Sequence, residues 1–323
     1  MTTTSLTSAS LPPANASMLP QEIKNLLPWD VDLLSADPIG GSGSNRRYWR
    51  LHFSSGLELI ATEGTVREEN EAFFYLSDCF RAADVNVPRV VAVSPDRMAY
   101  LQTSVGDRSL FEMLDRIDLI EKSMDLLASV HSVRAIDYSR CYPVAEMDRR
   151  SIMWDLNYFK YCFLKTSPGL TIDEPALEDD FERLADDLLS SGPKAFMVRD
   201  FQSRNVMIKD NEPWLIDFQG GRLGPVYYDV ASFLWQARAG FSPELRNAMV
   251  SRYCRAAGMD EAKFRRELPA FVIFRLLQVL GAYGFRGRWE RKEHFLASIP
   301  PALASLAEAI TPRYPYLYRL MAK

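Results

Sequence analysis

In the first third of the chain, apolar and polar positions alternate in the manner of β-strands. Residues 46–53 alternate between bulky and charged side chains, and residues 57–61 follow a turn-forming Ser-Ser-Gly sequence at positions 54–56. This pattern predicts a β-hairpin. Two further apolar runs, at residues 90–93 and 98–102, predict additional strands. We expect these strands to form one small mixed sheet.

Between the two strand pairs, the apolar positions change to helical spacing. Residues 67–83 carry apolar side chains that recur on one helical face, at Ala72, Phe73, Leu76 and Phe80. Glu68, Glu69 and Glu71 lie in the first turns, where acidic side chains interact favourably with the positive end of the helix dipole. The sequence therefore predicts a helix that packs on the small sheet.

A second helix is predicted after residue 108. Ser109 and Glu112 have the spacing of a capping box, which typically opens a helix. The apolar positions that follow are typical of an amphipathic helix and include Leu114, Ile117, Ile120, Met124 and Leu127. From there to the C-terminus the pattern is mainly helical, interrupted by one predicted hairpin.

This change from strands to helices predicts an α+β fold with two lobes. At 323 residues the chain exceeds an average single domain. We expect a disordered tail, an N-terminal lobe with the small mixed sheet, a hinge, and a larger, mainly helical C-terminal lobe. Their predicted bounds are residues 1–18, 19–102, 103–108 and 109–323.

The hairpin inside the helical part carries polar side chains that can act together. Two short apolar runs, separated by the turn-forming sequence DNEP, predict its strands. Pairing Lys209 with Trp214 across the turn would bring Val206 opposite Asp217, with Asn205 beside it. Cross-strand neighbours lie about 5 Å apart at Cβ, which suits an amide oxygen and a carboxylate that share one Mg²⁺ ion.

The segment 198–205 adds a pattern for phosphoryl transfer. It reads VRDFQSRN and matches the kinase catalytic-loop template H-R-D-x-x-x-x-N except at Val198, which we expect only to pack. We predict that Asp200 orients the acceptor hydroxyl and that Asn205 and Asp217 bind Mg²⁺, with ATP as the phosphoryl donor. The other interpretation is that these are loop residues capping a surface hairpin, since Asp and Asn favour turns.

Composition and charge are those of an ordinary globular protein. Hydrophobic residues make up 47% and charged residues 25%, and a net charge of -4 gives no support to a general nucleic-acid binder. The four cysteines form no C-x-x-C pair and the three histidines are scattered, so a zinc site has little support. We detect no apolar run near the roughly 20 residues that span a bilayer. We expect a cytoplasmic protein without membrane partners, for which a monomer is plausible and the oligomeric state is open.

With these motifs, the chain resembles the phosphotransferase family that includes aminoglycoside phosphotransferases, choline kinases and related small-molecule kinases with a protein-kinase-like fold. The similarity begins near residue 36. Its most specific parts are the segment 199–205, Asp217, and the sequence GPVYYD at residues 224–229. The resemblance implies the catalytic and metal-binding roles given above, and a structural role for Asp229, which would brace the catalytic loop.

The phosphate-binding lysine of such kinases is missing. Between Lys24 and Lys122 the chain contains no lysine, so its ion pair with a helix glutamate cannot form. A glycine-rich turn instead precedes Arg46, and its backbone amides could approach phosphate while Arg46 supplies positive charge. The alternative for this turn is a flexible connection between strands. We assign to the nucleotide site Gly41, Gly43, Arg46 and Gln102.

The acceptor is predicted from a closer resemblance. The sequences GSNRRY at 43–48, DFQSRN at 200–205 and DFQ at 217–219 are most similar to those of bacterial cell-wall recycling kinases. The resemblance implies phosphorylation of the anomeric hydroxyl of N-acetylmuramic acid or N-acetylglucosamine. Residues 238–293, which should flank the acceptor site, hold twelve Lys and Arg against six Asp and Glu. A polycationic aminoglycoside would favour the opposite charge.

Two residues are assigned to the acceptor site. Arg286 lies between glycines that allow close backbone approach, and an arginine can bind a sugar carboxylate with two hydrogen bonds. Asp155 lies in the predicted helix 151–164, which would line the same pocket. An aminoglycoside or amino-alcohol phosphotransferase is one alternative. A pseudokinase that acts as a binding module is another, suggested by Val198 and the missing lysine.

Overall fold

The chain forms two compact units in the computed structural model, which describes residues 18–40 and 46–321. Among these residues, the first unit comprises those up to residue 78 together with residues 88–105. The second comprises residues 79–87 and everything from residue 106 onward. Residues 79–87 thus belong with the helical unit, although their sequence position suggested the N-terminal lobe.

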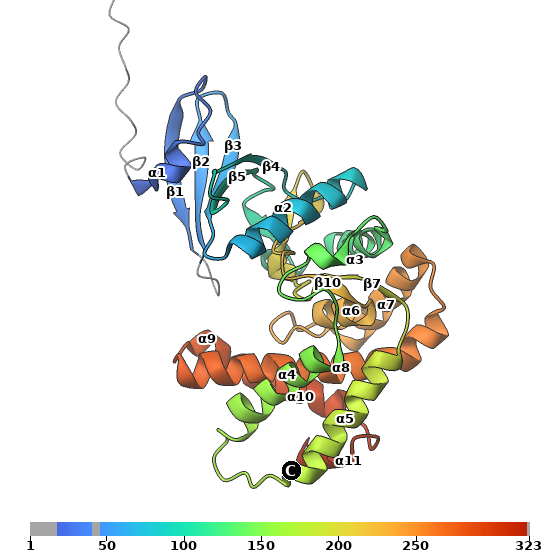
Figure 1. The fold of residues 1–323 in the computed structure, drawn as a ribbon. Helices are drawn as coiled ribbons and strands as arrows, with labels where there is room; N and C mark the ends of the chain where they lie inside the picture. The colour runs from blue at the N-terminus through green and yellow to red at the C-terminus, as the bar shows by residue number, and fades with distance from the viewer. Residues whose placement is uncertain (1–17, 41–45, 322–323) are drawn as a thin grey trace, which may run out of the picture. The chain divides into compact units, whose positions relative to one another are not determined.

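A five-stranded sheet in the order β1-β2-β3-β5-β4 forms the first unit (Figure 1). The elements that begin in this unit are α1 (Gln21–Lys24), β1 (Leu33–Ile39), β2 (Arg47–Phe53), β3 (Glu58–Glu63), α2 (Arg67–Ala82), β4 (Val90–Val93) and β5 (Ala99–Thr103). The predicted hairpin is confirmed as β2 and β3. The sheet is antiparallel throughout rather than mixed, because β5, the returning strand of the β4–β5 hairpin, is the one that pairs with β3.

Strand alternation divides the side chains of this sheet between two faces. On one face, Trp49 and Leu51 of β2 lie in an apolar core with Ile23 of α1. On the other, Tyr100 of β5 packs edge to face against Phe74 of α2, with ring centroids 5.0 Å apart. Each face of the sheet is therefore covered by a helix of the same unit.

The second unit is mainly helical and contains two small antiparallel sheets, β7 with β10 and β6-β8-β9. Its elements are β6 (Arg108–Ser109), η2 (Leu110–Glu112), α3 (Ile117–Ser132), η3 (Tyr138–Arg140), α4 (Arg149–Phe159), η4 (Lys160–Leu164), α5 (Glu174–Ser190), β7 (Lys194–Met197), η5 (Ser203–Asn205), β8 (Val206–Lys209), β9 (Glu212–Leu215), β10 (Arg222–Pro225), α6 (Tyr227–Leu234), α7 (Pro243–Ala257), α8 (Glu261–Tyr283), η6 (Gly284–Trp289), α9 (Glu293–Leu296), α10 (Ile299–Ala309) and α11 (Pro315–Met321).

The predicted capping box opens a 3₁₀ turn rather than the amphipathic helix. The amide and hydroxyl of Ser109 donate to Glu112 Oε2 at 2.7 and 3.0 Å, around η2. Helix α3 begins only at Ile117. The prediction was wrong because the chain makes a second turn, closed by the Arg116 amide and the Met113 carbonyl, before the helix starts.

Helix α8 lies at the centre of the second unit and contacts α4, α6 and α10 (Figure 1). Helix α8 and η6 form one continuous helix, Glu261–Trp289. In the described part of the chain, this is the one helix that by length and composition could cross a membrane. The expectation that no apolar stretch reaches this length was therefore wrong. Since 61% of its most apolar window is buried inside the protein, packing in the core accounts for its apolar character.

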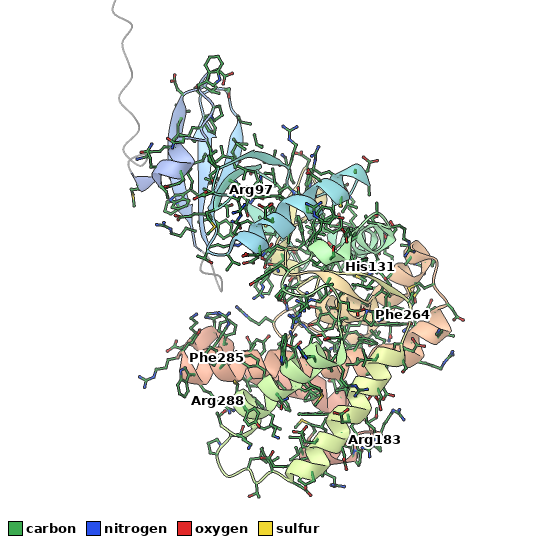
Figure 2. All side chains as sticks on the ribbon, in the orientation of Figure 1. Arg97, His131, Arg183, Phe264, Phe285 and Arg288 are labelled. Atoms are coloured by element: carbon green, nitrogen blue, oxygen red, sulfur yellow. The ribbon has the colours of Figure 1, made fainter. Side chains whose placement is uncertain are left out.

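Two π-helical turns, η4 and η6, continue α4 and α8 and lie against each other. Phe285 and Arg288 belong to η6 (Figure 2), and Arg288 Nη1 donates to the Phe163 carbonyl of η4 at 2.9 Å. The backbones approach so closely that a Cβ on Gly284 would lie 2.2 Å from the Cys162 carbonyl oxygen. Glycine is therefore required at this contact.

We expect Gly284→Ala to lower the free energy of unfolding by about 1–3 kcal/mol, because the clashing atoms belong to backbone and the two helices must separate to relieve the contact. Equilibrium denaturation measures this change. The matched control is Gly220→Ala, whose Cβ would meet no atom within 4 Å. Equal stability of the two variants would contradict the close contact between η4 and η6.

Candidate active site

The predicted catalytic loop begins directly after the buried strand β7. Val198 is 1% exposed, as expected for a position that only packs. The next residue, Arg199, has a φ of 78°, which is uncommon for a residue other than glycine. Asp200 follows this left-handed residue, so the backbone of Arg199 sets the direction in which the Asp200 side chain leaves the strand.

Asp229 holds this unusual backbone in place. Its carboxylate, fully buried in α6, accepts hydrogen bonds from the amides of Val198 at 2.7 Å and Arg199 at 2.8 Å. His131 Nε2 of α3 also contacts it at 3.1 Å, and His131 Nδ1 contacts the Tyr253 hydroxyl at 2.7 Å. Asp229 lies inside α6 rather than at its N-cap, Val226. The brace implied by the family resemblance is therefore present.

Arg275 of α8 contacts the Asp200 carboxylate. Its Nη2 donates to Asp200 Oδ1 at 3.1 Å, and its Nη1 donates to the Tyr228 hydroxyl at 3.0 Å. The Arg275 side chain is 5% exposed and that of Asp200 47%. Burial raises the pKa of Asp200, but the charges of Arg275, Arg204 and Arg199 outweigh it and hold that pKa below its usual value. Asp200 is therefore a carboxylate near neutral pH, suited to accept a hydrogen bond from a hydroxyl.

Sequence reasoning missed Arg275. The available signal was a single arginine within the apolar run PAFVIFRLL of a long helix. A charged residue at such a position is rarely buried without a partner. What the sequence could not supply was the partner, because Asp200 lies 75 positions away in the chain.

The hairpin that carries the metal candidates forms as β8 and β9, but its register was predicted wrongly. Lys209 pairs with Glu212 rather than with a residue two positions further on. Asp210 and Asn211 both have positive φ, 53° and 61°, and make a two-residue turn of the type that matches strand twist. Pro213 consequently lies within β9, at the edge of its sheet, where its missing amide is tolerated.

Asn205 and Asp217 still meet, just beyond the paired strands. Asn205 Nδ2 donates to Asp217 Oδ2 at 3.3 Å and to the Asp200 carbonyl at 2.9 Å. The Ile216 amide donates to the Asn205 carbonyl at 3.0 Å and extends the hairpin by one residue. Asp217 then has a φ of 61°, which turns the chain away from the strand. The side chains of Asn205 and Asp217 are therefore in contact although the two residues are not a cross-strand pair, because the left-handed backbone of Asp217 turns its side chain toward Asn205.

The donor set fits magnesium with a nucleotide present. Asn205 uses its Nδ2 for both hydrogen bonds, so its Oδ1 and the Asp217 carboxylate are hard oxygen donors on neighbouring positions. Among the residues that the structure describes, no three His, Cys, Asp or Glu side chains gather into a metal site. Magnesium with two protein ligands would therefore depend on phosphate and water oxygens for the rest of its shell.

Gln219 is a third side chain beside Asn205 and Asp217. It is 7% exposed, and its Nε2 donates to Asp217 Oδ1 at 2.7 Å. Both carboxylate oxygens of Asp217 thus accept a hydrogen bond from an amide side chain. A glycine at position 219 could not make the contact, so Gln219 is a positioning residue for Asp217.

In the first unit, Arg46 takes part in a buried ion pair. Its side chain is 2% exposed, and its Nη2 lies 3.3 Å from Glu69 Oε1 of α2 and 3.1 Å from Asn70 Oδ1. Burial lowers the pKa of Arg46, but contacts with Tyr100, Tyr48 and Glu69 raise it overall. The first unit has no lysine that could pair with a glutamate of α2, and Arg46 forms an ion pair with Glu69 of this helix instead. The assignment of Arg46 to the nucleotide site stays a prediction.

The other residues assigned to the nucleotide site are Gly41, Gly43 and Gln102. Gly41 and Gly43 lie outside the described residues. Gln102 lies in β5, opposite Ile60 of β3, and its Nε2 is 3.5 Å from Thr62 Oγ1. Its assignment stays a prediction.

The two residues assigned to the acceptor site lie in the second unit. Asp155 of α4 forms an ion pair with Arg199, whose Nη2 is 2.9 and 2.7 Å from its two oxygens. Arg286 lies in η6, with its guanidinium over the Phe295 ring at 5.6 Å. Asp155 therefore acts on the residue next to Asp200. Their roles toward an acceptor stay predictions.

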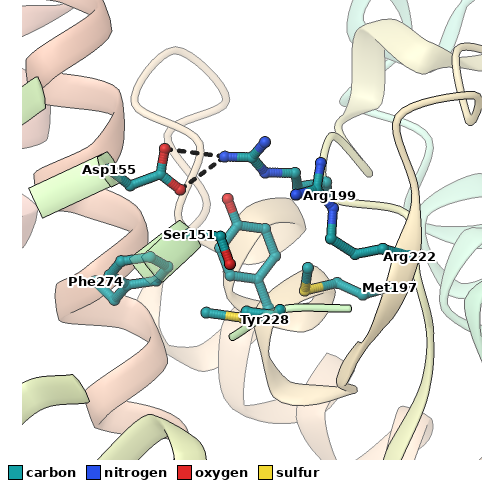
Figure 3. Close-up of a pocket in the computed structure, with 8 residues that line it drawn as sticks. Ser151, Asp155, Met197, Arg199, Arg222, Tyr228 and Phe274 are labelled. Carbon is teal, nitrogen blue, oxygen red and sulfur yellow. Dashed lines mark hydrogen bonds and ion pairs between the residues drawn. The ribbon is translucent and has the colours of Figure 1, made fainter. Parts of the chain in front are cut away.

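A small pocket opens beside the Asp155–Arg199 pair (Figure 3). Its lining comes from segments 147–155, 197–199 and 222–228 of the second unit and from α8. The lining residues are Met147, Ser151, Asp155, Met197, Arg199, Arg222, Tyr228 and Phe274. Tyr228 links this pocket to the catalytic carboxylate, because its hydroxyl accepts from Arg275, which also contacts Asp200. The pocket is thus one side chain away from Asp200.

Comparisons with known proteins agree with this geometry. A family model described as "Phosphotransferase enzyme family" matches residues 35–265. The N-acetylmuramate/N-acetylglucosamine kinase of Pseudomonas aeruginosa is 24% identical over 289 residues, which are 85% of this chain and 84% of that protein. The kinase of the same name from Neisseria meningitidis is 28% identical over 290 residues, 86% of each chain.

Solved structures of the same fold include two kinases of other acceptors. Plasmodium vivax ethanolamine kinase superposes with a TM-score of 0.64 at 13% identity, covering 88% of this chain and 84% of its own. The gentamicin complex of APH(2")-IIa superposes with a TM-score of 0.62 at 15% identity, covering 92% and 98%. Identities this low establish the fold alone. They confirm the predicted α+β, protein-kinase-like architecture.

We expect Arg275→Met to move the acid limb of the kcat/KM profile to higher pH. Arg275 helps hold the pKa of Asp200 below its usual value, and turnover requires the carboxylate, so removing this charge raises the pH at which activity is lost. Arg149→Met is the control, because Arg149 pairs with Glu182 and Asp186 on exposed helix surface. An unchanged profile in Arg275→Met would contradict the electrostatic role of Arg275.

We expect Gln219→Ala to weaken magnesium binding about tenfold, because the Asp217 carboxylate loses the donor that fixes its orientation. The KM for Mg²⁺ should rise while kcat at saturating Mg²⁺ stays close to that of the wild type. Binding of Mn²⁺ measured by electron paramagnetic resonance gives a readout independent of turnover. Gln21→Ala is the control, since that exposed side chain bonds to Asn25 in the first unit, and its metal dependence should not change.

Proposed function

Because the chain belongs to the phosphotransferase enzyme family and is a small-molecule kinase, we propose that it transfers the γ-phosphoryl group of ATP to a sugar hydroxyl, namely the anomeric hydroxyl of N-acetylmuramic acid or N-acetylglucosamine. Kinases of this family use ATP. The observation that carries the choice of acceptor is the match to N-acetylmuramate/N-acetylglucosamine kinases across 84–86% of their length. A role in cell-wall recycling and a cytoplasmic location, where ATP is available, belong to the same proposal.

Asp200 carries the chemistry in this proposal. A carboxylate whose pKa is held low is a weak base, so its main contribution is to accept a hydrogen bond from the acceptor hydroxyl and direct that oxygen toward the γ-phosphorus. As the new P–O bond forms and the bond to ADP breaks, the hydroxyl proton passes to the Asp200 carboxylate and from there to solvent water. Arg275 keeps the carboxylate ionised before transfer, and Asp229 keeps the loop in the conformation that presents it.

We also propose that the protein binds Mg²⁺ through two side chains. Asn205 and Asp217 would hold it, with Gln219 orienting the Asp217 carboxylate. The ion supplies charge neutralisation for the phosphate groups of the nucleotide. Arg46, paired with Glu69, is the cation that we assign to the phosphates in place of the missing lysine.

An aminoglycoside or amino-alcohol acceptor is the second candidate, because solved structures of the same fold include an ethanolamine kinase and a gentamicin complex. At their low identity, these two structures are similar to this chain in fold alone. The charge of the region that should flank the acceptor favours an amino sugar over a polycationic aminoglycoside, because residues 238–293 have twelve basic against six acidic side chains. Several of these basic residues are ion-paired, as Arg252 is with Asp125 and Glu121 and Arg275 is with Asp200. The argument therefore depends mainly on Arg286, the basic residue of this stretch that we assign to the acceptor site.

The acceptor can be tested by an ATP-consumption screen over N-acetylmuramic acid, N-acetylglucosamine, aminoglycosides and amino alcohols, with the linkage of the product determined by nuclear magnetic resonance. We expect turnover of the amino sugars and phosphate on the anomeric oxygen. Activity confined to aminoglycosides or amino alcohols would overturn the choice of acceptor.

We expect Asp200→Ala to reduce kcat by at least about 10²–10⁴-fold while the fold and ATP binding are retained. Asp179→Ala, an exposed aspartate on α5, is the matched control and should keep wild-type turnover. Unchanged kinetics in Asp200→Ala would overturn its catalytic assignment. A protein that fails to bind ATP with magnesium in a thermal-shift assay would instead favour the pseudokinase alternative.

A further inference from the structure

Arg222 is a buried cation without a carboxylate partner among the described residues. It opens β10 and is 2% exposed. Its Nη2 donates to the Gly220 carbonyl at 3.1 Å, whereas its Nε is fully buried and has no hydrogen-bond partner. An unpaired buried charge is costly to a folded protein, so such a residue normally has a counter-ion.

The groups around Arg222 are committed elsewhere. The one carboxylate that lines the pocket, Asp155, is paired with Arg199 through both of its oxygens (Figure 3). The Tyr228 hydroxyl bonds to Gln278 at 2.7 Å and to Arg275. The pocket therefore holds two guanidinium groups against one carboxylate, an excess of one positive charge. Burial and repulsion from Arg199 outweigh the attraction of Asp155 and lower the pKa of Arg222 to about 10, the direction expected where no further anion is bound.

The pocket also limits the size of what can neutralise it. Met147, Met197 and Phe274 form apolar walls and are each at most 5% exposed. The space among the eight lining residues is that of about one water-sized group. A sugar or nucleotide cannot enter, and a water molecule could bond to Nε but would leave the charge unbalanced.

We propose that this pocket is a binding site for one small monovalent anion, of the size and charge of chloride, held by Arg222 and Arg199. The site goes beyond the proposed transfer reaction and does not depend on the identity of the acceptor. Arg199 directly precedes Asp200, and Arg222 lies five residues after Asp217. The anion would cancel the repulsion between their guanidinium groups and so stabilise the catalytic loop against β10.

Thermal unfolding of the full-length protein tests this site. Potassium chloride is titrated against potassium gluconate at constant ionic strength, since gluconate is too large for the pocket. We expect a saturable rise of about 3 °C in the melting temperature with chloride and bromide but not with gluconate. Arg222→Met should abolish the response, and Arg252→Met, which removes an ion-paired arginine outside the pocket lining, should keep it.

A second variant keeps the test decisive if Arg222→Met does not fold. Asp155→Asn frees Arg199 and adds to the positive charge, so its half-saturating chloride concentration should fall several-fold. Crystals grown in bromide should show an anomalous peak between Arg199 and Arg222. A melting temperature insensitive to chloride, an equal response in Arg222→Met, or a water molecule at that position in the bromide crystals would overturn the proposal.

Discussion

Two backbone amides directly before Asp200, those of Val198 and Arg199, donate to one carboxylate, Asp229. Because Asp229 is fully buried, breaking either bond would leave a polar group unsatisfied in the interior. This constraint keeps Arg199 at its positive φ, a conformation that costs free energy in an L-residue. The directions of Asp200 and of the loop that ends at Asn205 follow from it. His131 and Tyr253 extend the network into the helical core, so the loop is anchored by packing far from the chemistry.

Charge around the site is arranged to keep one carboxylate ionised rather than to make it basic. Arg275 reaches Asp200 from the central helix, and Arg199, directly before Asp200, is itself paired with Asp155. In the reaction that we propose, a carboxylate so stabilised would orient the acceptor hydroxyl more than it abstracts a proton, which suits a loose phosphoryl-transfer transition state. The amides of Asn205 and Gln219 serve Asp217 in a similar way, by fixing its direction.

Local patterns predicted what depends on neighbours in the sequence. The β2–β3 hairpin, helix α2 and the presence of a hairpin between Asn205 and Asp217 followed from alternation, helical spacing and a turn signal. The hairpin register did not, because DNEP contains several turn formers and only the structure shows that the positive φ angles are at Asp210 and Asn211. Arg275, His131 and the Arg46–Glu69 pair could not be assigned at all, since each joins residues far apart in sequence through tertiary packing.

The Arg46–Glu69 ion pair determines which covalent reagents can modify the protein at this place. Lys24 is the single lysine in the first unit, and it lies in α1 rather than beside α2. A guanidinium remains protonated across the physiological range and is a poor nucleophile, unlike an amine whose pKa falls on burial. Acylating probes that label kinases through an active-site lysine therefore have no amine to modify at this ion pair.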